Sequence, residues 1–348
     1  MSFKTMANCL KASSVAILLL LFQPVSAQQN LDAVTQLLTQ RQPAFGNDFV
    51  VLIANNDSVF YQKEWGNIKV KTVAPIASAS KWLTAALVMA FVDEGKISLD
   101  DPVAKYLPVF EKYGKNYITI RHCLAHLTGI QNKEGKLAKL LERKKWASLD
   151  EEVSHFASNE IQTNPGTAFT YNDMGSNIAG RVLEVVSKKR FDLLIKQKLF
   201  NPLGMRQSTF STTDGSPSDP SAGAKSTATD YMAFLKMLLN NGKYNGQQIL
   251  SEASIKELRT IQTSNLPMQD VPKATDGFQY AAGAWVLAQN GNNATVLASP
   301  SLFGMWPVVD FCRGYAVLFF TKELLNDAKR EQYEDLKKLT DSYFPACK

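Results

Sequence analysis

The sequence predicts an α+β fold in which one antiparallel sheet is flanked by the terminal helices and carries an inserted all-helical domain. Strand-like runs occur only near the N-terminus and in the C-terminal third of the 348 residues, whereas helical periodicity dominates from about Ile118 to Asn241. Because both ends of the chain carry strands, we expect those ends to meet in a single sheet. A content of 45% hydrophobic and 20% charged residues excludes disordered and fibrous proteins.

The N-terminal elements are a helix, a hairpin and a second helix. A helix is expected over Leu31–Gln40, where apolar residues recur at helical spacing. The turn residues Asn55-Asn56-Asp57 separate two strand-like runs and predict a hairpin. The Ala- and Leu-rich stretch Ala77–Glu94 is predicted to be a buried helix that ends at Gly95. The strands of the hairpin are Phe49–Ala54 and Ser58–Trp65.

The rest of the chain is predicted to be helical first and strand-rich afterwards. Helices are expected at Arg121–Leu127, Leu149–Asn159, Asn177–Ser187, Phe191–Leu199 and Thr229–Asn240. Strands are expected at Tyr280–Ala288, Thr295–Ala298, Trp306–Phe311 and Gly314–Thr321. A last amphipathic helix is expected over Leu324–Tyr343.

Residues 1–27 are predicted to be a signal peptide that is removed on export. Lys4 and Lys11 form a positively charged start, residues 15–22 form a short apolar stretch, and the small residues 25–27 form a cleavage site. The apolar stretch is too short to span a bilayer, so we expect no stable membrane span. The mature domain, residues 28–348, is therefore expected to be periplasmic or secreted.

The charge of the chain argues against a nucleic-acid partner. The formal net charge is +6, which falls to about +4 without the two lysines of the signal peptide, and basic residues are not interleaved with aromatic ones. A small-molecule or peptide substrate is expected instead, with no nucleic acid. The sequence leaves the oligomeric state open.

Three cysteines remain in the mature chain. Cys312 lies in a predicted turn between strands and Cys347 lies next to the C-terminus, so a disulfide between them would fasten the tail. Two free thiols are an equally good interpretation, because the sequence does not give the distance between them. Cys123 lies in an apolar stretch and is expected to be a buried packing residue.

The three histidines do not form a catalytic or metal-binding motif. His122 and His126 stand four residues apart, but no glutamate lies between them and no third ligand is evident, so a zinc site is disfavoured. A hydrogen-bonded structural role at a helix end is expected for His126. No G-x-S-x-G sequence supports a nucleophile elbow. We therefore expect no metal or organic cofactor, and a serine nucleophile would need a base other than histidine.

Ser78-Ala79-Ser80-Lys81 is an S-x-x-K sequence at the start of the predicted helix 77–94. Three residues make nearly one helical turn, so the Lys81 amine can approach the Ser78 hydroxyl. The N–H groups at a helix start favour a developing oxyanion, and a partly desolvated lysine loses proton affinity and can act as a base. S-x-x-K by itself also arises by chance, so a structural role remains the alternative.

Tyr171 follows a Pro-Gly turn and precedes a predicted helix, a position from which its side chain can face a cleft. Its phenol can exchange protons with a serine when a lysine ammonium stabilises the phenolate. Simple packing at the helix entry is the other interpretation of this tyrosine.

Ser78-x-x-Lys81 together with Tyr171-x-Asp173 resembles the motifs of the serine beta-lactamase and penicillin-binding-protein superfamily. The branch it resembles holds class C-like beta-lactamases, D-alanyl peptidases and related esterases, whose second motif is Y-x-N. This resemblance implies the beta-lactamase/transpeptidase-like fold, a helical insertion at about 85–240 and an active site in the cleft between insertion and sheet. Further segments between about residues 45 and 322 are typical of the family: Glu94–Val103, Tyr106–Pro108, Thr119–Gly129, Leu199–Met205, Ser226–Asp230 and Tyr244–Gly246.

The resemblance also implies a third motif, K-T-G or H-x-G, on a strand near the C-terminus. The matching stretch here is Ser299-Pro300-Ser301. Ser299 would then line the strand side of the site, and the backbone N–H groups of Leu302 and Ser78 would form the oxyanion hole.

Three residues depart from the family pattern. Ser299 carries no positive charge, so a substrate carboxylate would lose its usual partner. Ser301 replaces glycine and adds a side chain where backbone must pass close to the substrate. Asp173 replaces asparagine and would tend to keep Lys81 protonated, which favours a Tyr171 phenolate over a neutral lysine as the base.

The function implied by the resemblance is that of a secreted or periplasmic serine hydrolase of the esterase or peptidase type. Ser78 would be the nucleophile that carries the acyl group, Lys81 would activate it, Tyr171 would be the general base and then the acid, and Asp173 would orient Lys81. A beta-lactamase or D-alanyl-D-alanine carboxypeptidase is one alternative. A catalytically impaired, penicillin-binding-like binding protein is another, suggested by Ser301 and Asp173.

Overall fold

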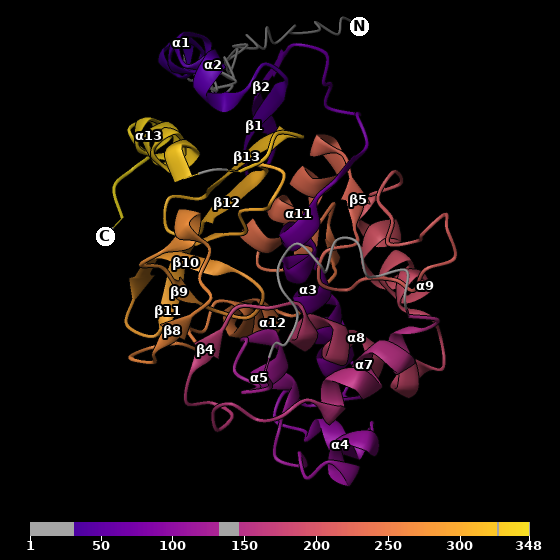
Figure 1. The fold of residues 1–348 in the computed structure, drawn as a ribbon. Coiled ribbons are helices and arrows are strands. Elements are labelled where there is room, and N and C mark those ends of the chain that lie inside the picture. The colour runs from indigo at the N-terminus through magenta and orange to yellow at the C-terminus, as the bar shows by residue number, and fades with distance from the viewer. Residues whose placement is uncertain (1–30, 132–145, 326, 348) are drawn as a thin grey trace, which may run out of the picture. The chain divides into compact units, whose positions relative to one another are not determined.

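The structure is a computed structural model that describes residues 31–131, 146–325 and 327–347 (Figure 1). The predicted signal peptide lies outside the described residues. Seven strands form one antiparallel sheet in the order β2-β1-β13-β12-β11-β10-β9. The strands are β1 Phe49–Asn55, β2 Val59–Trp65, β9 Gln279–Tyr280, β10 Trp285–Asn290, β11 Asn293–Ala298, β12 Trp306–Asp310 and β13 Tyr315–Thr321.

The two ends of the chain meet inside this sheet. β1 pairs with β2 in the predicted hairpin and pairs along its whole length with β13, where Phe49 lies opposite Thr321. This pairing confirms that the N-terminal and C-terminal strands form a single antiparallel sheet. It also explains why β1 is a continuous apolar run, since a central strand that is covered on both faces needs no polar side.

Alternate residues of β1 belong to two different cores. Val50 and Leu52 pack into the larger core, together with the helices from the middle of the chain. Phe49 and Val51 pack into a second core under the terminal helices. The two-residue period of a strand thus sends neighbouring side chains to opposite faces of the sheet.

The terminal helices cover one face of the sheet, as expected (Figure 1). Leu38, Phe45 and Tyr333 from these helices pack in one cluster with the sheet residues Phe49 and Phe319. The helices are α1 Asp32–Gln40, α2 Gln42–Phe45 and α13 Asp327–Asp341.

The opposite face of the sheet packs against the helices of the middle of the chain. Helix α11 (Ala228–Leu239) contacts β1, β12 and β13. Helix α3 (Ser80–Asp93) is surrounded, and every residue from Ser80 to Phe91 is buried. The prediction of a buried helix is therefore confirmed. The remaining α-helices are α4 Val109–Lys112, α5 Ile120–Leu124, α7 Leu149–Ser158, α8 Met174–Ser187, α9 Phe191–Ile195, α10 Asn201–Leu203 and α12 Glu252–Leu258.

Short elements complete the described chain. Three two-stranded sheets pair β3 with β5, β4 with β8, and β6 with β7. The short strands are β3 Ala74–Pro75, β4 Phe169–Thr170, β5 Lys225–Ser226, β6 Lys243–Tyr244, β7 Gln247–Gln248 and β8 Met268–Gln269. The short helices are 3₁₀ turns η1 Ala77–Ala79, η2 Val103–Lys105 and η5 Lys273–Thr275, and a π-helical segment η4 Lys196–Phe200.

Three predicted elements are wrong in detail, for reasons of backbone geometry. The predicted strand Tyr280–Ala288 is two strands, β9 and β10, because Gly283 has a φ of 80° and turns the chain between them. Helix α5 ends at Leu124 rather than Leu127, because His126 has a φ of 59°. The α-helix predicted from Ala77 begins at Ser80, after the 3₁₀ turn η1.

The cysteines are settled by the structure. Cys312, in the turn between β12 and β13, forms a disulfide with Cys347, which ties the C-terminal segment to the sheet. Cys123 is a free, fully buried thiol, as predicted.

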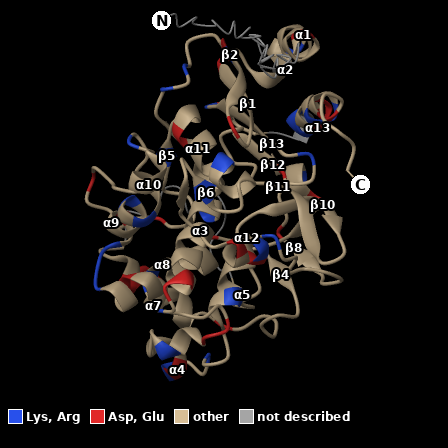
Figure 2. Cartoon of the chain, turned by 180° about the vertical axis from the view of Figure 1, so that it is seen from behind, with Lys and Arg blue, Asp and Glu red and all other residues tan. Residues whose placement is uncertain are grey.

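Acidic and basic residues are interspersed over the ribbon (Figure 2). A search of the described helices finds none with the length and apolar character needed to cross a membrane.

Candidate active site

Ser78 lies in the 3₁₀ turn η1, immediately before helix α3. The residue before it, Ala77, has a φ of 41°, a left-handed conformation that costs a non-glycine residue about 1–3 kcal/mol. Surrounding contacts hold the turn in place, because the Tyr231 hydroxyl donates to the Ala79 carbonyl at 3.0 Å and Ala79 N–H donates to Ile76. The Ser78 side chain is half-buried, just before the helix at whose start the sequence placed it.

Lys81 is buried in the first turn of α3, with 1% of its side chain exposed. Its ammonium donates to Asp173 Oδ1 at 2.8 Å and to the Ser221 carbonyl at 3.3 Å, and lies 5.1 Å from the ring centre of Tyr171. The structure therefore brings Lys81 close to Tyr171 and Asp173, which follow it by about ninety residues in the sequence.

Burial and charge act on Lys81 in opposite directions. Burial lowers the pKa of Lys81, but the charges of Asp173 and Tyr171 and hydrogen bonds to both outweigh it, so the pKa is raised above its ordinary value. Lys81 is therefore a fixed cation at neutral pH, which agrees with the effect expected of Asp173. The positive charge of Lys81 therefore stays beside the Tyr171 ring.

The loop 218–224 fastens the polar face of α3. Thr84 Oγ1 donates to the Pro220 carbonyl at 2.6 Å, and the Ser80 hydroxyl accepts a hydrogen bond from Ala224 N–H at 3.1 Å. The Ser221 carbonyl, which receives the Lys81 bond, is thus held by two neighbours of Lys81 on the same helix. This loop could not be recognised from the sequence, because it contributes backbone groups that no side-chain pattern marks.

Tyr171 joins β4 to α8, and Asp173 is the N-cap residue of α8. Tyr171 N–H donates to the Gln269 carbonyl at 3.2 Å, which anchors its backbone to β8. Its ring packs on His126 at 4.6 Å and on Trp285 at 5.2 Å between ring centres. The ring is therefore held between β10 and the segment that follows α5, and these contacts are compatible with a packing role as well as a catalytic one.

His126 has the hydrogen-bonded structural role that was expected, and His122 is a capping residue. His126 is buried, its Nδ1 accepts from Asn172 N–H at 3.4 Å, and its Nε2 lies 3.3 Å from the Tyr280 hydroxyl. His122 completes the capping box of α5 with Thr119, and burial lowers its pKa. Among the described residues, no group of three His, Cys, Asp or Glu side chains could hold a metal ion.

The third-motif turn, defined here as residues 299–305, joins β11 to β12. Ser299 and Ser301 are 3% and 1% exposed, and the Ser301 hydroxyl has no hydrogen-bond partner within the described parts of the chain. The side chain of Leu302 is 48% exposed. Ser301 thus points its hydroxyl into the protein, so the residue that replaces glycine does not add a polar group to the open surface.

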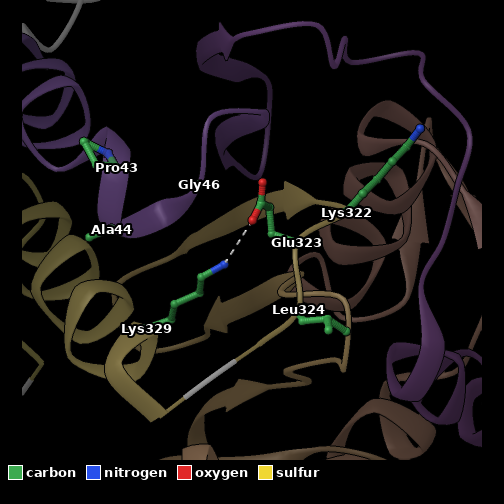
Figure 3. A pocket seen from close by; sticks show the side chains of 7 residues that line it. All are labelled: Pro43, Ala44, Gly46, Lys322, Glu323, Leu324 and Lys329. Atoms are coloured by element: carbon green, nitrogen blue, oxygen red, sulfur yellow. Dashed lines mark ion pairs between the residues drawn. The ribbon is translucent and has the colours of Figure 1, made fainter.

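A cavity of about 550 Å³ lies elsewhere, between α2, α13 and the end of β13 (Figure 3). Glu323 and Lys329 face each other across it at 3.9 Å. It contains none of the predicted site residues. Its lining residues are Pro43, Ala44, Gly46, Lys322, Glu323, Leu324 and Lys329.

The family follows from the match of the whole domain. A family model described as Beta-lactamase matches residues 40–341. The chain belongs to the beta-lactamase family. The resemblance drawn from the motifs is therefore confirmed, and with it a family of serine hydrolases that includes beta-lactamase-like and penicillin-binding-protein-like enzymes, esterases and D-alanyl peptidases.

Solved structures of this family share the fold. A structure from Bacteroides dorei DSM 17855 has 26% sequence identity and a TM-score of 0.79, and covers 90% of this chain and 99% of that one. EstCE1, described as a hydrolase with promiscuous acyltransferase activity, has 21% identity and a TM-score of 0.72, with 89% and 99% covered. These matches confirm the predicted α+β beta-lactamase/transpeptidase fold with its helical insert.

Two named bacterial proteins are also similar to this chain. Protein flp of Staphylococcus aureus (strain MW2) is 28% identical over 202 residues, which is 54% of this chain and 39% of that protein. The chain thus spans well under half the length of that relative. The D-alanyl-D-alanine-carboxypeptidase/endopeptidase AmpH of Escherichia coli (strain K12) is 21% identical over 304 residues, with 74% of this chain and 79% of AmpH covered.

Proposed function

We propose that this chain is an exported serine hydrolase that cleaves an ester or amide bond through an acyl-enzyme on Ser78. The observation that carries the proposal is the convergence of Lys81, Tyr171 and Asp173 beside the turn that holds Ser78. A buried cation, a phenol and a half-buried serine are the groups that acyl transfer without histidine requires.

The reaction has two steps. Ser78 Oγ attacks the substrate carbonyl carbon while its proton passes to the phenolate oxygen of Tyr171, which the Lys81 ammonium stabilises. The phenol then protonates the leaving alcohol or amine as the old bond breaks. In the second step Tyr171 takes a proton from water, the water oxygen attacks the acyl ester, and the proton returns to Ser78 as the acid leaves. The Ser78 and Leu302 N–H groups stabilise the oxyanion in both steps.

The substrate class follows from the charges at the site. Ser299 is neutral and buried where the family places a lysine or histidine, so it offers a substrate carboxylate no positive charge. Asp173 adds a carboxylate, 37% exposed, on the opposite side. We therefore favour a small neutral acyl ester or amide over a β-lactam or a D-alanyl peptide. The description of EstCE1 as a hydrolase with promiscuous acyltransferase activity supports an acyl-transferring hydrolase, and AmpH supports the carboxypeptidase alternative.

A binding protein without turnover is the second candidate. It is favoured by the Lys81–Asp173 ion pair, which holds the lysine proton and removes direct lysine-base chemistry. The two functions differ in one measurable property, the reactivity of Ser78.

The test is the intact mass of the mature protein after exposure to a fluorophosphonate probe. We expect one covalent adduct in the wild type, none in Ser78→Ala, and an unchanged adduct in the control Ser58→Ala, whose serine lies exposed in the β1–β2 turn. A folded wild-type protein that takes up no adduct would contradict the hydrolase proposal and leave the binding protein. With an adduct formed, turnover of p-nitrophenyl acetate without turnover of nitrocefin would support the esterase type.

A further inference from the structure

The third-motif turn is held by hydrogen bonds to four of its carbonyl groups. The Met305 carbonyl accepts from Ser301 N–H at 2.9 Å, and three further carbonyl groups accept the bonds that follow. The Ser301 carbonyl accepts from Gly304 N–H at 2.9 Å, inside the turn. The Leu302 carbonyl accepts from Leu325 N–H at 2.8 Å, in the segment between β13 and α13. The Gly304 carbonyl accepts from the Tyr333 hydroxyl of α13 at 2.8 Å. Two of the four bonds therefore come from the C-terminal segment.

These bonds set the direction of one N–H group. A peptide bond is planar and trans, so the N–H of Leu302 points opposite to the carbonyl of Ser301. The bond from Gly304 fixes that carbonyl, and therefore fixes the Leu302 N–H as well. In the described part of the chain, no hydrogen bond uses the Leu302 N–H as a donor, which leaves it available to an oxyanion.

Gly304 is in turn positioned by the C-terminal segment. It has a φ of 73°, and a Cβ at this position would lie 2.5 Å from the Glu323 carbonyl oxygen. The Tyr333 ring is buried and stacks on Trp306 at 4.6 Å between ring centres, and this packing fixes the direction of the Tyr333 hydroxyl. Both contacts leave Gly304 little freedom to move.

We infer that Tyr333 is a positioning residue for oxyanion stabilisation: its hydroxyl holds Gly304, and through Gly304 it aims the Leu302 N–H. This inference rests on the proposed function, because it assumes that Leu302 contacts a reacting oxygen. Tyr333 itself touches no substrate and lies on the face of the sheet covered by the terminal helices. Helix α13 would thereby position an oxyanion donor from one face of the sheet, whereas α3 carries Lys81 on the other face.

The test compares Tyr333→Phe with Tyr61→Phe. Tyr61 belongs to the same apolar cluster, and its hydroxyl makes a similar bond, to Thr35 Oγ1 at 3.0 Å, away from the third-motif turn. Each variant keeps its ring and loses one hydroxyl, so melting temperatures should fall by similar amounts. For p-nitrophenyl acetate, we expect Tyr333→Phe to lower kcat by about 10- to 100-fold with KM nearly unchanged, and to slow fluorophosphonate labelling in parallel. In Tyr61→Phe both rates should remain near those of the wild type.

The outcomes separate this inference from the proposed function. If the wild type labels and Tyr333→Phe matches Tyr61→Phe in kcat and labelling rate, the positioning role is wrong and the hydrolase proposal stands. If Tyr333→Phe raises KM and leaves kcat unchanged, the turn binds substrate without aiming an oxyanion donor, which also overturns the inference. A wild type that does not label contradicts the proposed function itself.

Discussion

Lys81 is a buried cation whose partners come from two distant segments of the chain. Asp173 supplies the counter-charge and Ser221 supplies a carbonyl, so the ammonium is both neutralised and hydrogen-bonded. An isolated buried ammonium would lose its proton to escape the cost of desolvation, whereas this one keeps it. The aspartate in the second motif therefore decides the protonation state of the lysine in the first.

Replacing Asp173 with asparagine should change the pH dependence of the reaction. Without the carboxylate, burial is less opposed and the pKa of Lys81 falls, so the alkaline limb of kcat/KM for p-nitrophenyl acetate should move to lower pH. Because the pKa of Lys81 is higher in the folded than in the unfolded chain, protonated Lys81 stabilises the fold. This stabilisation is complete below the unfolded-state pKa and is lost as the pH rises through the folded-state pKa. Asp173→Asn should therefore cost about 1–3 kcal/mol at neutral pH.

Because the pKa of Lys81 is raised above the ordinary lysine value, the pH profile is best measured from about pH 6 to 11, beside Asp57→Asn as control. Asp57 lies exposed in the hairpin turn, so its variant should keep the wild-type profile. An alkaline limb that stays in place in Asp173→Asn would show that Lys81 does not titrate in it.

At the scale of elements, α13 is fastened at its C-terminal end to the turn between β12 and β13. The Cys312–Cys347 disulfide makes one link, and Lys337 makes another by contacting Asp310 of β12 at 3.0 Å. The contact of Lys337 with Asp341 at 2.8 Å stays within α13. The disulfide closes a loop with a sequence separation of 35 residues, which in the chain-entropy model is worth about 3–4 kcal/mol. The tail is thus tied covalently, while ion pairs orient the helix.

Cys347→Ser should lower the free energy of unfolding in urea by about 2–4 kcal/mol. Reductant should destabilise the wild type by a similar amount and leave the double variant Cys312→Ser/Cys347→Ser unaffected. Esterase activity per folded molecule should be retained, because the Lys337 and Tyr333 contacts remain. Equal stability of reduced and oxidised wild type would contradict the assigned role of the disulfide.

At the scale of the whole described domain, one sheet separates two cores. Leu318 of β13 faces the helices of the middle of the chain, and its neighbour Val317 faces the terminal helices. Leu318→Ala should destabilise the fold by about 2–5 kcal/mol, because it removes a fully buried side chain and leaves a cavity. Leu324→Ala, at a leucine that is 63% exposed, should change the urea midpoint little. Similar midpoints for the two variants would contradict this assignment of the core.

Whether a segment is a helix or a strand could be predicted from local sequence where the hydrophobic periodicity is strong. The apolar run Ala77–Glu94 and the hairpin strands were predicted close to their observed bounds, because burial dictates their composition. Boundaries failed where a single residue adopts a positive φ, as at Ala77, His126 and Gly283. Tertiary contacts hold those conformations, and the residue types alone do not reveal them.

The sequence by itself determined the fold class, the pairing of the chain ends in one sheet, and the residues Ser78, Lys81, Tyr171 and Asp173 as candidates. It did so because the hydrophobic period of each element is a local property of the sequence, and because the motifs resemble those of a known family. Only the tertiary structure decided that Lys81 is a paired cation, that Cys312 and Cys347 are bridged, and that Tyr333 holds the third-motif turn. Those facts depend on distances between segments far apart in the chain, which packing of the whole domain sets.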